Sequence, residues 1–175
     1  ASEVLAATVR ATLADSAALQ LDTLSLPAGQ LIALLPVVPS DLAAEAELLR
    51  GWDLYVTAGS AAAALFEVWW THLERLLYDC LIPADLHELL AAPLSATVML
   101  AILRAPDGRL GADPVAARDA MLRDALRSAV QLLRARLGGL PAAWRWGVLH
   151  SVTLHHPLSR IAGIAKVFPK IGGPQ

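Results

Sequence analysis

Three histidines lie close together in the stretch WRWGVLHSVTLHHPLS, residues 144–159, together with two tryptophans, a glycine and a proline. Imidazole groups at this density could bind zinc and activate a water molecule for hydrolysis. Zinc-binding helices place two histidines four residues apart, and His150, His155 and His156 do not form such a pattern. In an extended chain, the adjacent His155 and His156 point to opposite faces. We therefore favour structural histidines over a metal hydrolase that uses these three residues.

The serines and carboxylates do not form a catalytic pattern either. No serine stands in a Gly-x-Ser-x-Gly elbow, and Ser151 beside His150 is no evidence for a triad, which is assembled in space. Arg104 and Arg109 flank a loop that we expect to be a solvated turn. The carboxylates beside predicted helices are interpreted as caps: Asp15, Asp22 and Asp53. The sequence thus predicts no catalytic residue and no metal ligand in this chain, and it does not identify substrate-binding residues.

The composition bounds the class of protein. Hydrophobic residues make up 56% of the 175 residues and the mean hydropathy is +0.52, above the roughly 45–50% that is usual for a soluble domain. The longest apolar stretches are interrupted by charges or proline, so we predict no membrane span and expect another chain to cover apolar surface. The net charge of −2 argues against a nucleic-acid partner. Cys80 is the single cysteine, and we predict that it is a small buried hydrophobe.

Helical periodicity dominates the first 140 residues. The clearest helix covers residues 59–82, with an apolar stripe and an Arg75–Asp79 pair on its other side. Asp113 caps a second long helix that has Pro114 at its first position and runs to Leu137. Shorter helices are predicted over 2–13, 17–22 (capped by Asp15 and Ser16), 26–36, 40–51 (capped by Ser40) and 86–103, the last split at Pro93.

After residue 140 the sequence is β-branched and aromatic, without a helical period. The predicted fold class is mainly α: a helical layer (1–140) followed by a short extended C-terminal strip (141–175). The five tryptophans are expected to pack in the core or between chains: Trp52, Trp69, Trp70, Trp144 and Trp146. Because the chain starts with Ala1 and ends in an apolar, Gly/Pro-rich segment, we expect it to be a fragment of a longer polypeptide.

Four segments, in order, resemble the penicillin acylase family of N-terminal nucleophile hydrolases. LQLDTLSLPAGQLIALL (19–35) resembles the family's Gln-x-Asp-x-x-Ser-x-x-Ala pattern, and LLRGWDLYVTAGSAAAALFEVWWTHL (48–73) its Leu-x-x-Trp-Asp stretch with the following helix. Residues 144–159 resemble its Trp-x-Trp-Gly-x-x-His…His-Pro-Leu stretch, and VFPKIGGPQ (167–175) the approach to its Gly-rich strand. In this family the histidine-rich stretch is architectural, carrying the chain from the helical layer toward the central sheets.

The resemblance implies an internal segment of the large chain of a four-layer αββα hydrolase. Family members cleave themselves into two chains and use the new N-terminal serine as nucleophile, with its own α-amino group as base. A backbone N–H and an asparagine form the oxyanion hole. No position here matches these residues: the chain starts with Ala1, and Ser2 is read as an N-cap. The structural calcium of the family is expected to bind upstream of this segment, and export to the periplasm or out of the cell is implied by the resemblance alone.

Two functions remain open at this point. The first is a scaffold segment of an amidohydrolase that removes acyl groups from amides such as β-lactam side chains or acyl-homoserine lactones. Its partners would be the small chain and the rest of the large chain. The alternative is a free-standing helical interaction module without enzymatic activity, which would bury its apolar surface in a partner or in a second copy.

Overall fold

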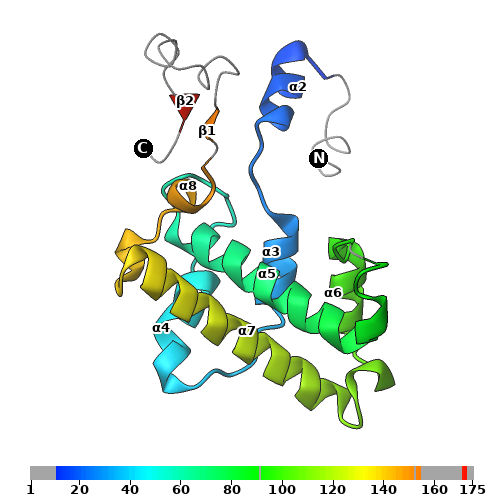
Figure 1. The fold of residues 1–175 in the computed structure, drawn as a ribbon. Helices are drawn as coiled ribbons and strands as arrows, with labels where there is room; N and C mark the ends of the chain where they lie inside the picture. Colours follow the sequence, from blue (N-terminus) through cyan, green and yellow to red (C-terminus); the bar gives the residue numbers. More distant parts are fainter. Residues whose placement is uncertain (1–10, 91, 152, 155–170, 173–175) are drawn as a thin grey trace, which may run out of the picture.

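The structure is a computed structural model that describes residues 11–90, 92–151, 153–154 and 171–172. Helices make up most of this part of the chain, which agrees with the predicted mainly α class (Figure 1). In chain order the elements are α2 (Leu13–Gln20), α3 (Leu26–Ile32), η1 (Ser40–Leu42), α4 (Ala43–Arg50), α5 (Ala61–Leu81), η2 (Ala84–Leu86), α6 (Ala96–Arg104), η3 (Gly108–Leu110), α7 (Pro114–Leu137), η4 (Pro141–Ala143), α8 (Trp146–Leu149), β1 (Thr153–Leu154) and β2 (Ile171–Gly172).

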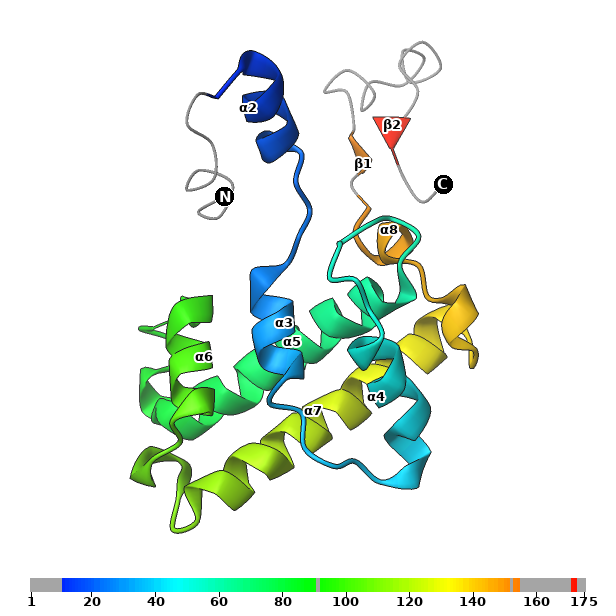
Figure 2. The same cartoon turned by 180° about the vertical axis from the view of Figure 1, so that it is seen from behind.

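The long helices α5 and α7 form the centre of the fold. They lie side by side and run in opposite directions in both views (Figures 1 and 2). Their facing side chains are fully or almost fully buried, among them Leu65, Trp69, Leu73, Leu77, Leu122, Leu126, Val130 and Leu133. Trp69 donates its indole N–H to the backbone oxygen of Leu122 at 3.0 Å, which satisfies the one polar atom of this side chain across the helix pair. The predicted stripes of both helices thus build a common core.

Side-chain caps begin both long helices, and the predicted cap at Asp113 is confirmed. Ser60 Oγ accepts a hydrogen bond from the backbone N–H of Ala63 at 3.1 Å at the start of α5. Asp113 Oδ1 accepts from Ala116 at 3.0 Å, and Pro114 occupies the first turn of α7. Gly138 ends α7 with a φ of +102°, a conformation that is open to glycine because it lacks a Cβ.

Shorter helices pack around this pair. α4 and α3 lie against one side of it, and α6 stands near the C-terminal end of α5 (Figures 1 and 2). The half-exposed Arg134 of α7 donates to Glu45 of α4 at 2.7 Å, and the Glu45 side chain is only 3% exposed. The predicted Arg75–Asp79 pair on α5 is present at 3.8 Å. One long-range ion pair therefore links α4 to the centre of the fold.

Some predicted helix starts are wrong. α2 begins at Leu13 rather than near residue 17, and its N-cap is Thr12, whose hydroxyl accepts from Asp15 N–H at 3.1 Å. The Asp15 carboxylate accepts from Thr12 N–H in return, so Asp15 belongs to a capping box inside the helix. Ser40 begins a 3₁₀ turn, and α4 starts only at Ala43. The predicted helix over 2–13 lies almost entirely outside the described residues.

Residues 141–175 are described only up to Ser151, at Thr153–Leu154 and at Ile171–Gly172. Trp146–Leu149 form the one-turn helix α8, where the sequence predicts an extended segment. Among the described residues after α8, β1 pairs with β2 in antiparallel fashion, Thr153 opposite Gly172 and Leu154 opposite Ile171. The aromatic and β-branched residues in this short stretch therefore do not distinguish a helical turn from a strand at Trp146–Leu149.

The burial of Cys80 is also predicted wrongly, because its side chain is exposed near the end of α5. Leu76, another member of the predicted stripe, is 37% exposed. The described part of the chain carries further exposed large apolar side chains, including Leu13 at 91% and Leu21 at 80%, both at α2. Among the residues that the structure describes, no helix has both the length and the hydropathy that crossing a bilayer requires.

Candidate functional site

The predicted histidine cluster is described only at His150. This residue follows α8, and its exposed ring stacks on Trp146 with a centroid distance of 4.9 Å and an interplanar angle of 15°. His155 and His156 lie outside the described residues. Within the described ranges, no three histidine, cysteine, aspartate or glutamate side chains are grouped closely enough to hold a metal ion.

The described serines and aspartates mostly serve the backbone. Ser60 and Ser95 cap α5 and α6 through their hydroxyl groups. Asp22 Oδ1 accepts from Leu24 N–H at 3.0 Å, and Asp53 Oδ1 accepts from Tyr55 N–H at 3.1 Å. The prediction that Asp22 and Asp53 cap helices is therefore wrong, because each carboxylate bonds to the backbone two residues further on, in a loop.

The loop at 105–113 contains a bidentate ion pair. Arg109 donates through Nε and Nη2 to the carboxylate of Asp107, and the hydrogen bonds from Arg109 lower the pKa of Asp107. Both side chains are more than half exposed, so this pair shapes a solvated turn, as predicted. Arg104 lies elsewhere: it borders a groove of about 480 Å³ between α3 and α6, whose lining is otherwise largely apolar.

The tryptophans pack in the core or against it, as expected. Trp69 and Trp144 are fully buried, and Trp144 donates its indole N–H to the backbone oxygen of Gly138 at 2.9 Å. Trp52 and Trp70 flank Phe66, with ring centroids at 5.6 and 5.8 Å. These rings therefore serve packing and not a pocket floor.

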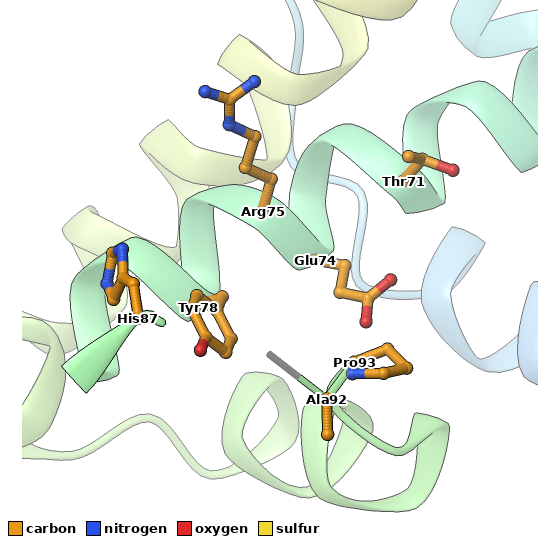
Figure 3. A pocket seen from close by; sticks show the side chains of 7 residues that line it. All are labelled: Thr71, Glu74, Arg75, Tyr78, His87, Ala92 and Pro93. Carbon is orange, nitrogen blue, oxygen red and sulfur yellow. The ribbon is translucent and has the colours of Figure 1, made fainter. Parts of the chain in front are cut away.

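A cleft on the surface of α5 was not predicted. It has a volume of about 380 Å³ and is lined by Thr71, Glu74, Arg75, Tyr78, His87, Ala92 and Pro93 (Figure 3). The four α5 residues are three or four positions apart or adjacent, whereas the other wall comes from the turns after the helix. Tyr78 and His87 were missed because no spacing rule connects a helix face with a turn that folds back onto it.

The polar groups of this cleft are held by backbone carbonyls. Tyr78 donates its hydroxyl to the oxygen of Leu90, and the Nε2 of His87 lies 2.9 Å from the oxygen of Ile82. Because a carbonyl oxygen only accepts, Nε2 carries the hydrogen. The two rings contact each other with centroids 5.0 Å apart. These bonds fix the turn against α5, and they occupy the groups that a general acid or base would need.

Two titratable groups of α5 are perturbed without a catalytic arrangement around them. Burial raises the pKa of Glu67, and the charge of His150 opposes that change. Burial lowers the pKa of His72, and Arg75 acts in the same direction. Perturbed pKa values are found at structural positions as well as at active sites, so they do not by themselves define a reaction.

Three of the four family-like segments meet at the loop 52–60. Leu24 of the first segment forms an antiparallel bridge with Tyr55, and Val56 N–H donates to the oxygen of Thr23 at 3.0 Å. Gly147 of the third segment donates its N–H to the oxygen of Ala58 at 2.8 Å. The segments that carry the resemblance are therefore connected through backbone contacts at one place.

Gly147 leaves little room for a side chain at this contact. A Cβ at position 147 would lie 3.0 Å from the Cβ and 3.3 Å from the backbone oxygen of Ala58. The backbone neighbour cannot move away as a flexible side chain would. The Trp-Gly pair in the histidine-rich stretch thus permits a close approach of two chain segments.

The comparisons with known proteins agree with this picture. The family model for penicillin amidase matches residues 1–174, and the comparison with curated proteins gives no match. The matched region includes the first three segments on which the resemblance rests and residues 167–174 of the fourth. Since the match covers nearly the whole sequence, the chain belongs to the penicillin amidase family.

Proposed function

We propose that the chain is a scaffold segment of a penicillin-acylase-like amidohydrolase, which cleaves acyl groups from amides such as β-lactam side chains or acyl-homoserine lactones. The observation that carries this proposal is the family match over residues 1–174, together with the meeting of three family-like segments at loop 52–60. The segment would supply the rigid α5–α7 pair. The nucleophilic serine would belong to another part of the polypeptide.

The rest of the enzyme follows from the family. The full molecule would have the four-layer αββα architecture, and export to the periplasm or out of the cell would bring it to its substrates. Its partners would be the small chain and the remaining large chain. The full molecule would also bind the structural calcium ion that the family resemblance implies. Any such ion would be held by those other parts.

The test is an intact-mass measurement of the complete gene product under denaturing conditions, followed by an assay with a chromogenic acyl anilide. We expect a processed protein that contains a chain beginning with serine and that releases the aniline, whereas the 175-residue chain alone releases none. A gene product consisting of a single 18.5 kDa species, or hydrolysis by the isolated chain, would contradict the proposal. A complete gene product that is itself a monodisperse, cooperatively folded 18.5 kDa protein would instead support a free-standing interaction module.

A pair of glycine variants tests the scaffold role within the complete enzyme. Gly147→Ala places a Cβ against Ala58, and overpacking of this kind destabilises a fold by about 1–3 kcal/mol. Gly139→Ala is the matched control, since a Cβ there has no neighbour within 4 Å. We expect Gly147→Ala to reduce the yield of active enzyme with an unchanged KM, and Gly139→Ala to leave both unchanged. Equal yields for the two variants would refute the assigned role of the junction.

A further inference from the structure

The cleft on α5 has the size and lining of a small-ligand site. Its volume of about 380 Å³ falls within the roughly 300–1,000 Å³ that is typical of ligand pockets. Its lining surface is mainly apolar, and Pro93, Ala92 and the ring of Tyr78 contribute to it. A ligand that fits would therefore have an apolar part of the size of one ring.

The negative charge of the cleft comes from Glu74. Figure 3 shows the Glu74 carboxylate and the Tyr78 ring on the same side of α5, toward Ala92 and Pro93, while Arg75 extends away from them. The Nε of Arg75 lies 3.8 Å from a carboxylate oxygen of Asp79, so Asp79 and not Glu74 is the ion-pair partner of Arg75. Within the described part of the chain, Glu74 makes no hydrogen bond and no ion pair, although its side chain is half-buried.

The walls of the cleft are fixed before any ligand binds. The bonds of Tyr78 to Leu90 and of His87 to Ile82 hold the turn against the helix. The His87 ring packs against one side of the Tyr78 ring, with the two ring centroids 5.0 Å apart. A ring fixed in this way, next to an unpaired carboxylate, attracts a cation through both its π electrons and the neighbouring negative charge.

We propose that this cleft binds a small organic ammonium ion, with the ammonium group at Glu74 and the apolar part against Tyr78 and Pro93. The inference does not depend on the amide hydrolysis proposed above, because it uses only residues of this chain. It assigns a ligand class to a site that lies apart from the junction of the family-like segments.

The experiment is a titration of the complete ¹⁵N-labelled gene product with phenethylammonium chloride, followed in two-dimensional ¹H–¹⁵N TROSY spectra at pH 7.5. We expect amide shifts at Thr71, Glu74, Tyr78 and Ala92, with a Kd on the order of 1 mM, since burial of the ring contributes about 2 kcal/mol and the exposed ion pair and the aromatic contact about 1 kcal/mol each. Raising the salt concentration should weaken binding, because it screens the ion pair.

Two analogues, one neutral and one negatively charged, test which ligand charge the cleft prefers, without any change to the protein. Phenethyl alcohol retains the ring and lacks the charge, and phenylacetate has a similar size and the opposite charge. Both should shift these amides much less than the ammonium ion at equal concentration. Equal shifts by phenylacetate, or no shift of the cleft amides at about twenty times the expected Kd, would overturn the proposal.

Variants locate the charge on Glu74. Glu74→Gln should weaken binding about three- to fivefold, which is the range of an exposed ion pair. Glu88→Gln is the matched control, because Glu88 is exposed and does not line the cleft. A far-ultraviolet circular dichroism spectrum and melting curve of each variant confirm that the fold is retained. The same Kd for Glu74→Gln and Glu88→Gln would show that the carboxylate is not the binding group.

Discussion

Two ion pairs of this chain form a matched experiment on burial. Arg134 and Glu45 are 2.7 Å apart, and Arg50 and Glu47 are 2.8 Å apart. The arginines are similarly exposed, at 47% and 40%, and each lies in the last turn of its helix. The glutamates differ: Glu45 is 3% exposed and Glu47 is 72% exposed. Removal of each arginine therefore isolates the effect of burial on the carboxylate that remains.

The perturbation is Arg134→Met, with Arg50→Met as its control. Loss of one partner from a fully buried pair destabilises a protein by about 3–5 kcal/mol, and the exposure of Arg134 reduces that figure to about 2 kcal/mol. The exposed pair should contribute less than about 1 kcal/mol. Helix propensity does not separate the two variants, because Arg and Met are close on that scale. Helix dipole effects are similar as well, since both arginines lie in last turns.

The assay is urea unfolding followed by circular dichroism, with thermal melting as a second measurement. For a chain of this length, 2 kcal/mol corresponds to a decrease in Tm of about 4–8 °C. The double variant Glu45→Met/Arg134→Met should recover most of the loss, because it removes the stranded carboxylate. If Arg134→Met lowers the free energy of unfolding no more than Arg50→Met does, the argument from burial is refuted.

Further predictions concern α5. Burial raises the pKa of Glu67 above its ordinary value of 4.5. The stability that the protonated Glu67 carboxyl contributes is therefore present below pH 4.5 and is lost as the pH rises through the folded-state pKa. Glu67→Gln should gain stability relative to the wild type between pH 4.5 and 7, measured by urea titration. The lowered pKa of His72 gives a contribution that is present above pH 6.5 and is lost as the pH falls, so His72→Gln should flatten the stability profile below pH 6.5. Trp69→Phe removes the donor to Leu122 and part of a buried ring, which should cost about 1–3 kcal/mol of unfolding free energy. The half-exposed Trp70 provides the control, and Trp70→Phe should cost less than half as much.

The elements that the sequence predicts correctly are those in which local and tertiary effects agree. α5 and α7 each combine a capping residue, a long apolar stripe and a terminating signal, and both are long enough to bury that stripe against the other. The apolar repeat of a helix does not indicate how much of the helix length is covered by the elements that pack against it. Cys80 lies one residue from the end of α5, and it is exposed although it follows the apolar repeat.

Short elements were predicted less well, because several signals compete within a few residues. The Thr12-x-x-Asp15 pattern is a capping box, and this signal was available in the sequence, but Asp15 and Ser16 were chosen as the cap instead. Trp146–Leu149 contain one aromatic and one β-branched residue, yet they form a single turn of helix whose Gly147 N–H donates to the oxygen of Ala58. Tertiary contacts of this kind override local propensity.

The candidate cleft could not be read from the sequence for a related reason. Its helix residues are spaced as any exposed face of α5 would be, and His87 becomes relevant only because its turn folds back onto Tyr78. Two bonds to backbone oxygens create this arrangement. Neither bond has a sequence signature, since a carbonyl acceptor exists at every residue.

The described half of the histidine-rich stretch, residues 144–151, makes backbone contacts with the rest of the fold and a ring contact within itself. It approaches loop 52–60 so closely that a Cβ at Gly147 would lie 3.0 Å from Ala58, and the same loop pairs with Leu24 from the first family-like segment. Trp146, next to this glycine, is covered on one side by the ring of His150. In the described part of WRWGVLHSVTLHHPLS, Gly147 thus admits a neighbouring backbone, and the rings of Trp146 and His150 cover each other. These contacts join chain segments, as we expect of an architectural element.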